Sequence, residues 1–250
     1  MNGSAGRAIA GYRDTTIRVP SDLLSSSLLT NAGFPHAFTT RGSGDFATLR
    51  DPERLREYQE RLAAGVGFDR SRLYQTKQVH GRNVVACGGD PAELLRVEAD
   101  GLVAEPGTGH AAAVRVADCV PVLLASRDTG RVSAVHAGWR GVEARILEVA
   151  LAKLGAPGSV VAAIGPCIGP CCFEVGADVA ARLGHVVRRE GDKAHVDLRA
   201  AVRAQLVLAG VSDASVEDVP GCTKHEAERF HSYRRDGDAS GRLIAVVVAR

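Results

Sequence analysis

The segment Val132-Ser-Ala-Val-His136-Ala-Gly138-Trp139-Arg140-Gly decides how the fold is interpreted, because it joins a strand to a helix. Residues 132–135 form an apolar run typical of a short buried strand, and Gly138 permits a tight turn after it. Residues 142–154 carry apolar side chains at helical spacing. Histidine, tryptophan and arginine at such a turn can reach a ligand, and they can equally close the turn over the core. We therefore expect a functional site where His136 leaves the strand.

Further apolar runs and helical patterns outline the rest of the fold. Strands are predicted at residues 17–19, 83–86, 101–104, 111–116, 121–125, 132–135, 160–164, 215–219 and 243–249. Helices are predicted over 52–64, 142–154, 176–183 and 198–208. Several strands follow one another without a helix between them, which favours mixed sheets. No internal repeat or low-complexity tract interrupts the chain. The sequence thus predicts an α/β (α+β) fold, a single domain with mixed β-sheets flanked by helices.

Composition excludes several classes of protein. At 250 residues with 45% hydrophobic side chains, the chain can bury a substantial core. A net charge of +2 and an aromatic content of 4% supply neither a basic stripe nor stacking platforms, so nucleic acid is excluded as a partner. The chain has no apolar run of membrane-spanning length and no apolar leader after its N-terminus. We therefore expect no membrane association and a cytoplasmic location.

The six cysteines are expected to stay reduced, because a chain of this size needs no disulfide. Cys167-x-x-x-Cys171-Cys172 resembles a metal knuckle. No second Cys or His pair at zinc-finger spacing accompanies it, however. The sequence therefore argues against a structural zinc there.

Three other residues have the chemistry of a catalytic centre: His80, Cys119 and His136. Two imidazoles and a thiolate are a ligand set for a catalytic zinc that keeps a fourth position open for water or substrate. The same groups suit a Cys-His nucleophilic pair, and each could also be an inert turn histidine or buried cysteine. Separations of 39 and 17 residues form no local zinc signature, so the fold must bring them together.

Other motifs exclude further chemistries. His225 and His231 are six residues apart, so they lie on different helix faces and do not form a zinc-protease motif. Neither GxxxxGK[ST] nor GxGxxG occurs, which removes support for nucleotide hydrolysis and NAD chemistry. Arg41 and the pair Arg234-Arg235 remain candidates for binding an anion.

A series of short motifs occurs in a fixed order: Thr39-Thr-Arg41, Gln78-Val-His80-Gly, Ala99-Asp100-Gly-Leu, Ala117-Asp118-Cys119-Val-Pro-Val, His136-Ala-Gly-Trp-Arg140-Gly, Ile164-Gly-Pro-x-Ile-Gly, Cys172-Phe-Glu174-Val and Ser232-Tyr-Arg-Arg-Asp-Gly-x-x-x-Gly-Arg242. This set strongly resembles the YfiH-like, laccase-domain family. The resemblance covers nearly all of residues 34–250, and it implies a YfiH-like catalytic domain there, related to cysteine-hydrolase-like architectures. Residues 1–33 are then an N-terminal extension with the first strand.

The resemblance also implies that His80, Cys119 and His136 are catalytic and converge on one Zn²⁺. Family members have been assigned phosphorolysis of purine nucleosides (adenosine, inosine and methylthioadenosine) with adenosine deamination, polyphenol oxidation, and editing of peptidoglycan precursors. Copper-dependent oxidation would need a cluster of many histidines, and the chain contains eight in all. The resemblance therefore favours a zinc-dependent purine nucleoside phosphorylase with adenosine deaminase activity. A Cys-His amide hydrolase acting on a peptidoglycan precursor is the alternative, and copper-dependent polyphenol oxidase is the least favoured.

In this interpretation the partners are a nucleoside and phosphate, and a monomer is compatible with the sequence. Arg140 and Arg41 would neutralise phosphate or developing charge. Gln78 would bind a substrate edge or stabilise its turn, and Asp118 would orient a histidine ligand. The chain departs from the family pattern at residues 42–50 and at His231, which affects the expected role of Arg41 and the substrate preference.

Overall fold

Strands that are apolar on both faces build two stacked sheets. The structure is a computed structural model that describes residues 22–47 and 51–250. In β14 (Leu243–Val248), Ala245 and Val247 pack between the sheets, whereas Ile244 and Val246 pack on the opposite side with residues of α2 (Pro52–Val66). Successive side chains of a strand point to opposite faces. Burial on both faces therefore explains why the strands read as continuous apolar runs.

The first large sheet has the order β1-β2-β14-β6-β3. Its other strands are β1 (Leu23–Leu24), β2 (His36–Thr39), β6 (Ala111–Val116) and β3 (Leu73–Tyr74). The β3–β6 pair is parallel and the remaining pairs are antiparallel.

The second large sheet has the order β13-β9-β7-β8-β5-β4. Its strands are β13 (Val216–Asp218), β9 (Val160–Ile164), β7 (Val120–Ser126), β8 (Val132–Ala137), β5 (Gly101–Ala104) and β4 (Val84–Ala86). The outermost pairs, β13–β9 and β4–β5, are parallel, and the central pairs are antiparallel. The prediction of mixed sheets in one α/β domain is confirmed.

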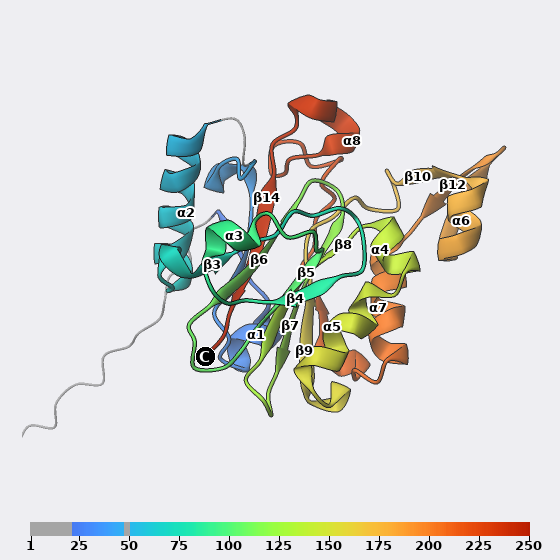
Figure 1. The fold of residues 1–250 in the computed structure, drawn as a ribbon. Helices are drawn as coiled ribbons and strands as arrows, with labels where there is room; N and C mark the ends of the chain where they lie inside the picture. The colour runs from blue at the N-terminus through green and yellow to red at the C-terminus, as the bar shows by residue number, and fades with distance from the viewer. Residues whose placement is uncertain (1–21, 48–50) are drawn as a thin grey trace, which may run out of the picture.

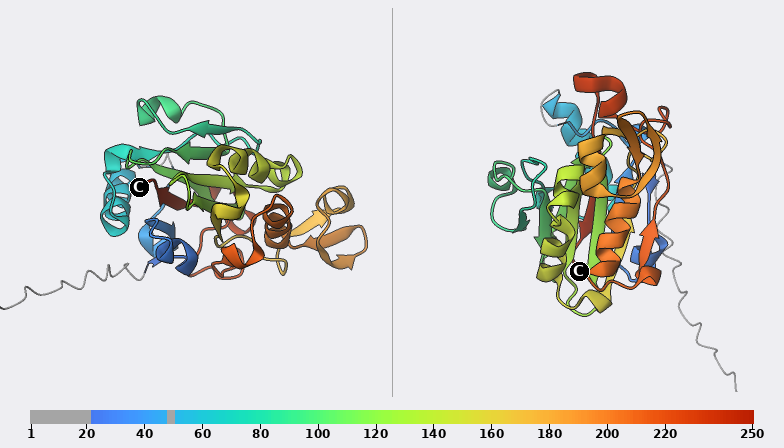
Figure 2. Two further views of the ribbon diagram at one scale, coloured as in Figure 1. Left: turned by 90° about the horizontal axis from the view of Figure 1, so that it is seen from below. Right: turned by 90° about the vertical axis from the view of Figure 1, so that its right-hand side faces the viewer.

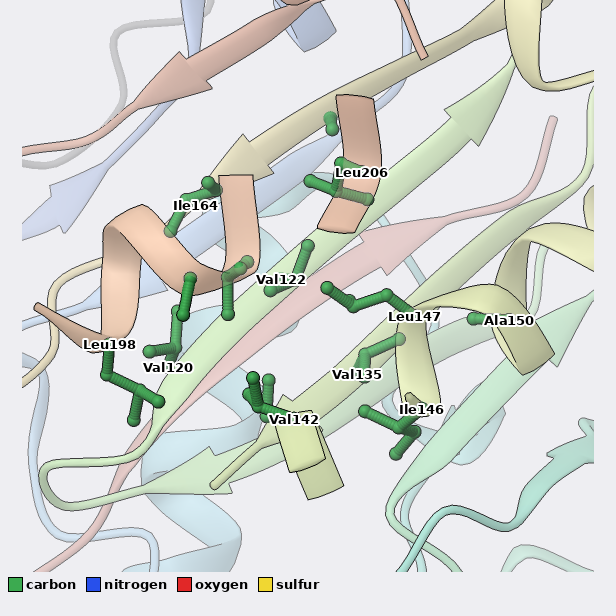
Figure 3. Packing of buried hydrophobic residues seen from close by; sticks show 14 of the residues in the cluster. Val120, Val122, Val135, Val142, Ile146, Leu147, Ala150, Ile164, Leu198 and Leu206 are labelled. Carbon is green, nitrogen blue, oxygen red and sulfur yellow. The ribbon is translucent and has the colours of Figure 1, made fainter. Parts of the chain in front are cut away.

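Helices cover the outer faces of both sheets (Figure 1). On the second sheet these are α4 (Trp139–Glu143), α5 (Ile146–Leu154) and α7 (Leu198–Leu208). Figure 3 shows Leu147 of α5 and Leu206 of α7 facing the strand side chains Val122 and Val135 in one buried cluster. The order of layers is therefore α2, first sheet, second sheet, and the α5–α7 pair.

Smaller elements surround this core. A third sheet, β10 (Glu174–Gly176), β12 (Lys193–Val196) and β11 (Val186–Glu190), carries α6 (Ala177–Leu183) and projects from the body (Figures 1 and 2). The remaining helices are α1 (Ser27–Asn31), α3 (Pro91–Leu94), α8 (Tyr233–Asp236) and the 3₁₀ turns η1 (Arg41–Ser43), η2 (Arg70–Arg72), η3 (Pro157–Ser159), η4 (Asp213–Ser215) and η5 (Gly237–Ala239). Within the described ranges, no helix combines the length and apolarity needed to span a bilayer.

The structure differs from the sequence-based expectation at several elements, and β1, β2 and β3 of the first sheet are among the strands that were not predicted. The single helix predicted over 142–154 is wrong: α4 ends at Glu143 and α5 begins at Ile146, because Arg145 has a φ of 62°. A left-handed residue cannot continue a right-handed helix. The β10–β12–β11 sheet was not predicted, since its outer strand β11 is mostly exposed and charged. The strand predicted at 17–19 lies outside the described residues.

Gly165 allows the two sheets to approach each other. A Cβ placed on this residue would overlap the Phe38 ring of β2 and lie 2.8 Å from Pro121 Cγ of β7. We predict that Gly165→Ala lowers the free energy of unfolding by about 1–3 kcal/mol, because the packed core cannot absorb the methyl group. Urea denaturation measures this change.

Gly158→Ala is the matched control, because no heavy atom lies within 4 Å of its added Cβ. Equal stability of the two variants would contradict the close approach at Gly165.

Candidate metal centre and pocket

The strand register places Cys119 beside the turn that follows His136. Cys119 directly precedes β7, His136 is the penultimate residue of β8, and the antiparallel register pairs Val120 with Ala137. Residues 117–119 carry the chain from β6 in the first sheet to β7 in the second. Asp118 makes this crossing with a φ of 96°, a conformation that Asp adopts more readily than most residues. The thiol therefore lies at the junction of the two sheets.

His80 reaches the same place from the loop between β3 and β4. The buried Asp100 carboxylate accepts the backbone N–H groups of Val79, His80 and Gly81 at 3.2, 2.9 and 2.6 Å. Asp100 precedes β5, which pairs with β8. The backbone N–H of His136 donates to the Asp100 carbonyl at 2.7 Å. One residue thus fixes the His80 loop to the strand that carries His136.

The three side chains form a compact set of metal donors. One ligand atom from each of His80, Cys119 and His136 lies within 4.8 Å of the others. The two imidazole rings are 4.8 Å apart between centroids and meet edge-on at 75°. A Cβ on Gly138 would lie 3.0 Å from His80 Cδ2 and 3.1 Å from Cys119 Sγ. The turn glycine therefore keeps a side chain out of the donor cluster.

The charges of Cys119 and His136 stabilise each other. Burial opposes ionisation of the thiol, but the charge of His136 and hydrogen bonds from both imidazoles lower the pKa of Cys119 to about 6. Burial likewise opposes protonation of His136, but the Cys119 thiolate and the hydrogen bond to Asp100 raise its pKa to about 9. The site thus favours a thiolate, which is the form of cysteine that binds metals and acts as a nucleophile.

Asp100, rather than Asp118, orients the histidine. His136 Nδ1 lies 2.8 Å from Asp100 Oδ1, whereas Asp118 accepts the Thr223 hydroxyl at 2.6 Å and the Arg234 backbone N–H at 2.6 Å. The partners of the Asp118 carboxylate are thus Thr223 and Arg234, and its expected role toward a histidine ligand stays a prediction without a hydrogen bond to support it. Burial would raise the pKa of Asp100, but hydrogen bonds from His136 and Gly81 hold it below its ordinary value.

A pocket of about 760 Å³ opens beside the donors and includes all three of them in its wall. Five cationic side chains line it, against two carboxylates, Asp118 and Asp238; the cations are Lys77, Arg115, Arg140, Arg234 and Arg242. The apolar part of the wall contains Ile168, Phe173 and Trp139. The pocket therefore suits an anionic group joined to a flat, largely apolar one.

Arg140, which the sequence suggested as an anion-binding residue, lies in the wall of this pocket. It follows Trp139 in α4, is exposed, and its guanidinium carbon lies 4.6 Å from the centroid of the Trp139 ring. This stacking limits the conformations of the arginine without consuming its N–H donors.

Two other sequence-based candidates have different roles. Gln78 lines the pocket, but its amide donates to the Arg115 carbonyl at 2.7 Å and accepts the Arg115 N–H at 2.8 Å. It thereby extends the edge of β6, which supports the turn-stabilising interpretation. Arg41 is not among the residues lining the pocket, and its Nη1 donates to the Ala227 carbonyl at 3.0 Å. Its expected place beside the substrate stays a prediction that the lining of this pocket does not support.

Sequence reasoning missed three contributors to the site. Asp100 lies in the motif Ala99-Asp100-Gly, directly before a predicted strand, and this position could have indicated a role at the site. Arg115 lies inside β6 and Arg242 directly precedes β14. Arg115 belongs to no motif, and Arg242 ends the motif that begins at Ser232 but was given no role there; the stacking of the strands brings both to the pocket.

Comparisons with known proteins agree with this architecture. The family described as "Multi-copper polyphenol oxidoreductase laccase" matches residues 38–250. A Deinococcus radiodurans protein named purine nucleoside phosphorylase is 41% identical over 238 residues, covering 87% of this chain and 90% of that protein. A protein named adenosine deaminase RL5, from an unknown prokaryotic organism, is 37% identical over 78% of this chain and 81% of its own length.

The crystal structure of the Bacillus licheniformis hypothetical protein YfiH superposes with a TM-score of 0.83, covering 93% of this chain and 98% of that one. At 22% identity this likeness concerns the fold alone. The family implies a metal, and the structure contains a cluster of donors able to hold one. The match over residues 38–250 and the 41% identity to a full-length relative show that the chain belongs to the YfiH-like, laccase-domain family.

Proposed function

We propose that the protein is a zinc-dependent purine nucleoside phosphorylase acting on adenosine, inosine and methylthioadenosine, with adenosine deaminase activity. The observation that carries this proposal is the position of the His80, Cys119 and His136 donors in the wall of a cation-lined pocket. The printed names of the relatives supply the substrate class. Phosphorolysis needs a place for phosphate next to a nucleoside, and the pocket offers both surfaces.

The donor set fits zinc. A thiolate and two imidazoles match catalytic zinc sites that leave one position open, and the missing Cβ of Gly138 leaves room among the donors. His136 presents Nε2 to the site because its Nδ1 is bonded to Asp100. Among the described residues, this is the only donor group with two histidines. Copper oxidases use clusters of many histidines, so the donor set favours zinc over copper. When bound, zinc supplies Lewis acidity and activates water.

The remaining steps belong to the side chains of the chain itself. Arg140, held against Trp139, binds a phosphate oxygen in a charge-assisted hydrogen bond. Arg234 and Arg242, which also line the pocket, add positive charge. Ile168 and Phe173 provide apolar surface for the purine ring. Binding energy is thus divided between an anion site and a base site, which together position the glycosidic bond for attack.

We predict that the purified protein, given inosine and phosphate, forms hypoxanthine and ribose 1-phosphate, and that it converts adenosine partly to inosine. In Arg140→Gln, the KM for phosphate rises by about 10- to 100-fold, because one charge-assisted hydrogen bond of about 1.5–3 kcal/mol is lost. Chromatography of the products over a phosphate titration measures both effects.

Arg41→Gln is the matched control and leaves the KM for phosphate unchanged, because Arg41 lies outside the pocket wall. Absence of free base and ribose 1-phosphate with every purine nucleoside would refute the proposed function. Equal effects of the two arginine variants would instead refute the assigned anion site.

A second prediction concerns the carboxylate behind the histidine. Asp100→Asn weakens zinc binding by about 10- to 100-fold, because the neutral amide no longer fixes the tautomer of His136. Competition with a chromophoric chelator measures the affinity. Asp118→Asn is the comparison, since Asp118 adjoins Cys119 but bonds Thr223 and Arg234. If Asp118→Asn weakened zinc binding as strongly, the orienting role of Asp100 would be excluded.

One observation favours a second function. Cys119, His136 and Asp100 form a thiol–imidazole–carboxylate series, which is the arrangement of a cysteine nucleophile with its base. An amide hydrolase acting on a peptidoglycan precursor would use this series without metal. Metal analysis separates the two functions. Stoichiometric zinc that is lost in Cys119→Ala and His80→Ala supports the phosphorylase, and a metal-free protein as purified supports the hydrolase.

We predict that in the chelator-treated protein the alkylation rate of Cys119 by iodoacetamide is half-maximal near pH 6, because its pKa is about 6. Below that pH the thiol gains a proton and the rate falls; above it the thiolate reacts fully. His136→Ala moves the midpoint upward, since the charge and hydrogen bond that stabilise the thiolate are lost. Peptide mass spectrometry identifies the alkylated residue. A midpoint near the ordinary value of 9.0 would contradict the thiolate–imidazolium pair.

A further inference from the structure

A second cluster of soft donors lies where two loops leave adjacent strands. Cys171 and Cys172 follow β9, and Cys222 and His225 follow β13. Because β9 and β13 are parallel neighbours, their carboxyl ends lie at the same edge of the second sheet. An isolated parallel bridge between Cys167 and Cys222 continues that pairing into the loops. Residues about 50 positions apart are thereby brought side by side.

The donor atoms gather around Cys171 Sγ, and one ligand atom from each of Cys171, Cys172 and His225 lies within 4.8 Å of the others. Cys171 Sγ lies 3.5 Å from Cys172 Sγ, 3.6 Å from Cys222 Sγ and 3.9 Å from His225 Nδ1. Zinc–sulfur bonds of about 2.3 Å in a tetrahedron place sulfur atoms about 3.8 Å apart. A disulfide would require about 2.05 Å. All the cysteines are free thiols in the structure, so the cluster has the geometry of a metal site and not that of a disulfide.

The backbone around the cluster is adapted to a bound thiolate. The Gly169 N–H donates to Cys222 Sγ at 3.2 Å, an interaction that favours the anionic sulfur. A Cβ on Gly169 would lie 3.3 Å from Cys222 Sγ and 3.4 Å from Cys171 Sγ. Glycine at this position therefore leaves space beside the donors. Cys167 is separate: its buried sulfur accepts the Arg199 Nη2–H at 3.6 Å.

We propose that Cys171, Cys172, Cys222 and His225 bind a second zinc ion, which has a structural role. Three thiolates and one imidazole complete a tetrahedron, so no position remains for substrate. This distinguishes the second site from the set of His80, Cys119 and His136, which has three protein donors. The Cys222-x-x-His225 pair supplies the partner that Cys171-Cys172 lacks in its own stretch of sequence.

The second ion would fasten the loop after β9, which contributes Ile168 and Phe173 to the pocket wall, to the loop after β13. Thr223, next to Cys222, donates its hydroxyl to Asp118 at 2.6 Å and its N–H to the Cys167 carbonyl at 3.0 Å. Ile168, which lines the pocket, donates its N–H to the Asp118 carbonyl at 2.9 Å. Both loops thus hold the turn that precedes Cys119, and the second zinc holds the loops to each other.

The test is the zinc content of the full-length protein, reduced under anaerobic conditions, incubated with excess zinc sulfate and desalted. Mass spectrometry of the metals should find about two zinc ions per chain, one for each donor group. Cys222→Ser and His225→Ala should each lose about one ion. Cys119→Ala should lose the other ion, and Cys222→Ser combined with Cys119→Ala should lose both. Cys87→Ser is the control and should keep both, because Cys87 is buried apart from both donor groups.

A second readout covers variants that fold poorly. The Cys119→Ala protein, loaded with cobalt(II) instead of zinc, should keep the sulfur-to-metal absorption band. The double variant Cys119→Ala/His225→Ala should lose this band, and His225 is an exposed residue, so its substitution disturbs the fold little. The proposal is overturned if Cys222→Ser and His225→Ala retain the zinc content of the unchanged protein. It is also overturned if the second ion is copper, or if intact mass shows a Cys171 disulfide in the reduced, zinc-treated protein.

Discussion

The Asp100 carboxylate is the constraint on which the candidate centre depends. It is fully buried, and it accepts the backbone N–H groups of residues 79–81 together with the ring of His136. A buried charge without such partners would be very unfavourable. The loop must therefore close around the carboxylate, and in closing it carries His80 toward Cys119. The hydrogen bonds that stabilise the buried Asp100 carboxylate are thus the same contacts that position His80 in the donor cluster.

Much of the scaffold follows from its apolar pattern. Strands buried on both faces, such as β7 and β14, appear in the sequence as uninterrupted apolar runs, and they form within one or two residues of the predicted bounds. Helix α7 forms over the predicted residues, 198–208. The strands of the third sheet escaped prediction because β11 has little apolar burial, and pairing with β12 decides its conformation. The break at Arg145 likewise depends on tertiary packing and not on helix propensity.

The roles of the residues at the site follow less directly from the sequence than the scaffold does. Residue types and the family resemblance named His80, Cys119 and His136, but spacing carried no sign that they meet. The sequence suggested Asp118 as the carboxylate that orients a histidine ligand, whereas the register of β5 against β8 places Asp100 against His136. The sequence left Gln78 open between a substrate contact and a turn-stabilising role, and its two hydrogen bonds to the backbone of Arg115 favour the second. Neighbours across strands, which sequence order conceals, decide these roles.

The crossing at residues 117–119 has a consequence for how the protein reaches its native state. Cys119 stands between a strand of one sheet and a strand of the other, His136 belongs to the second sheet, and His80 depends on a loop that leaves the first. The three donors can meet only after the two sheets have docked, and contacts of this sequence separation form late. An ion that requires all three donors cannot guide the early steps of folding. Its binding energy stabilises the finished molecule alone, so metal occupancy reports that assembly of the two sheets is complete.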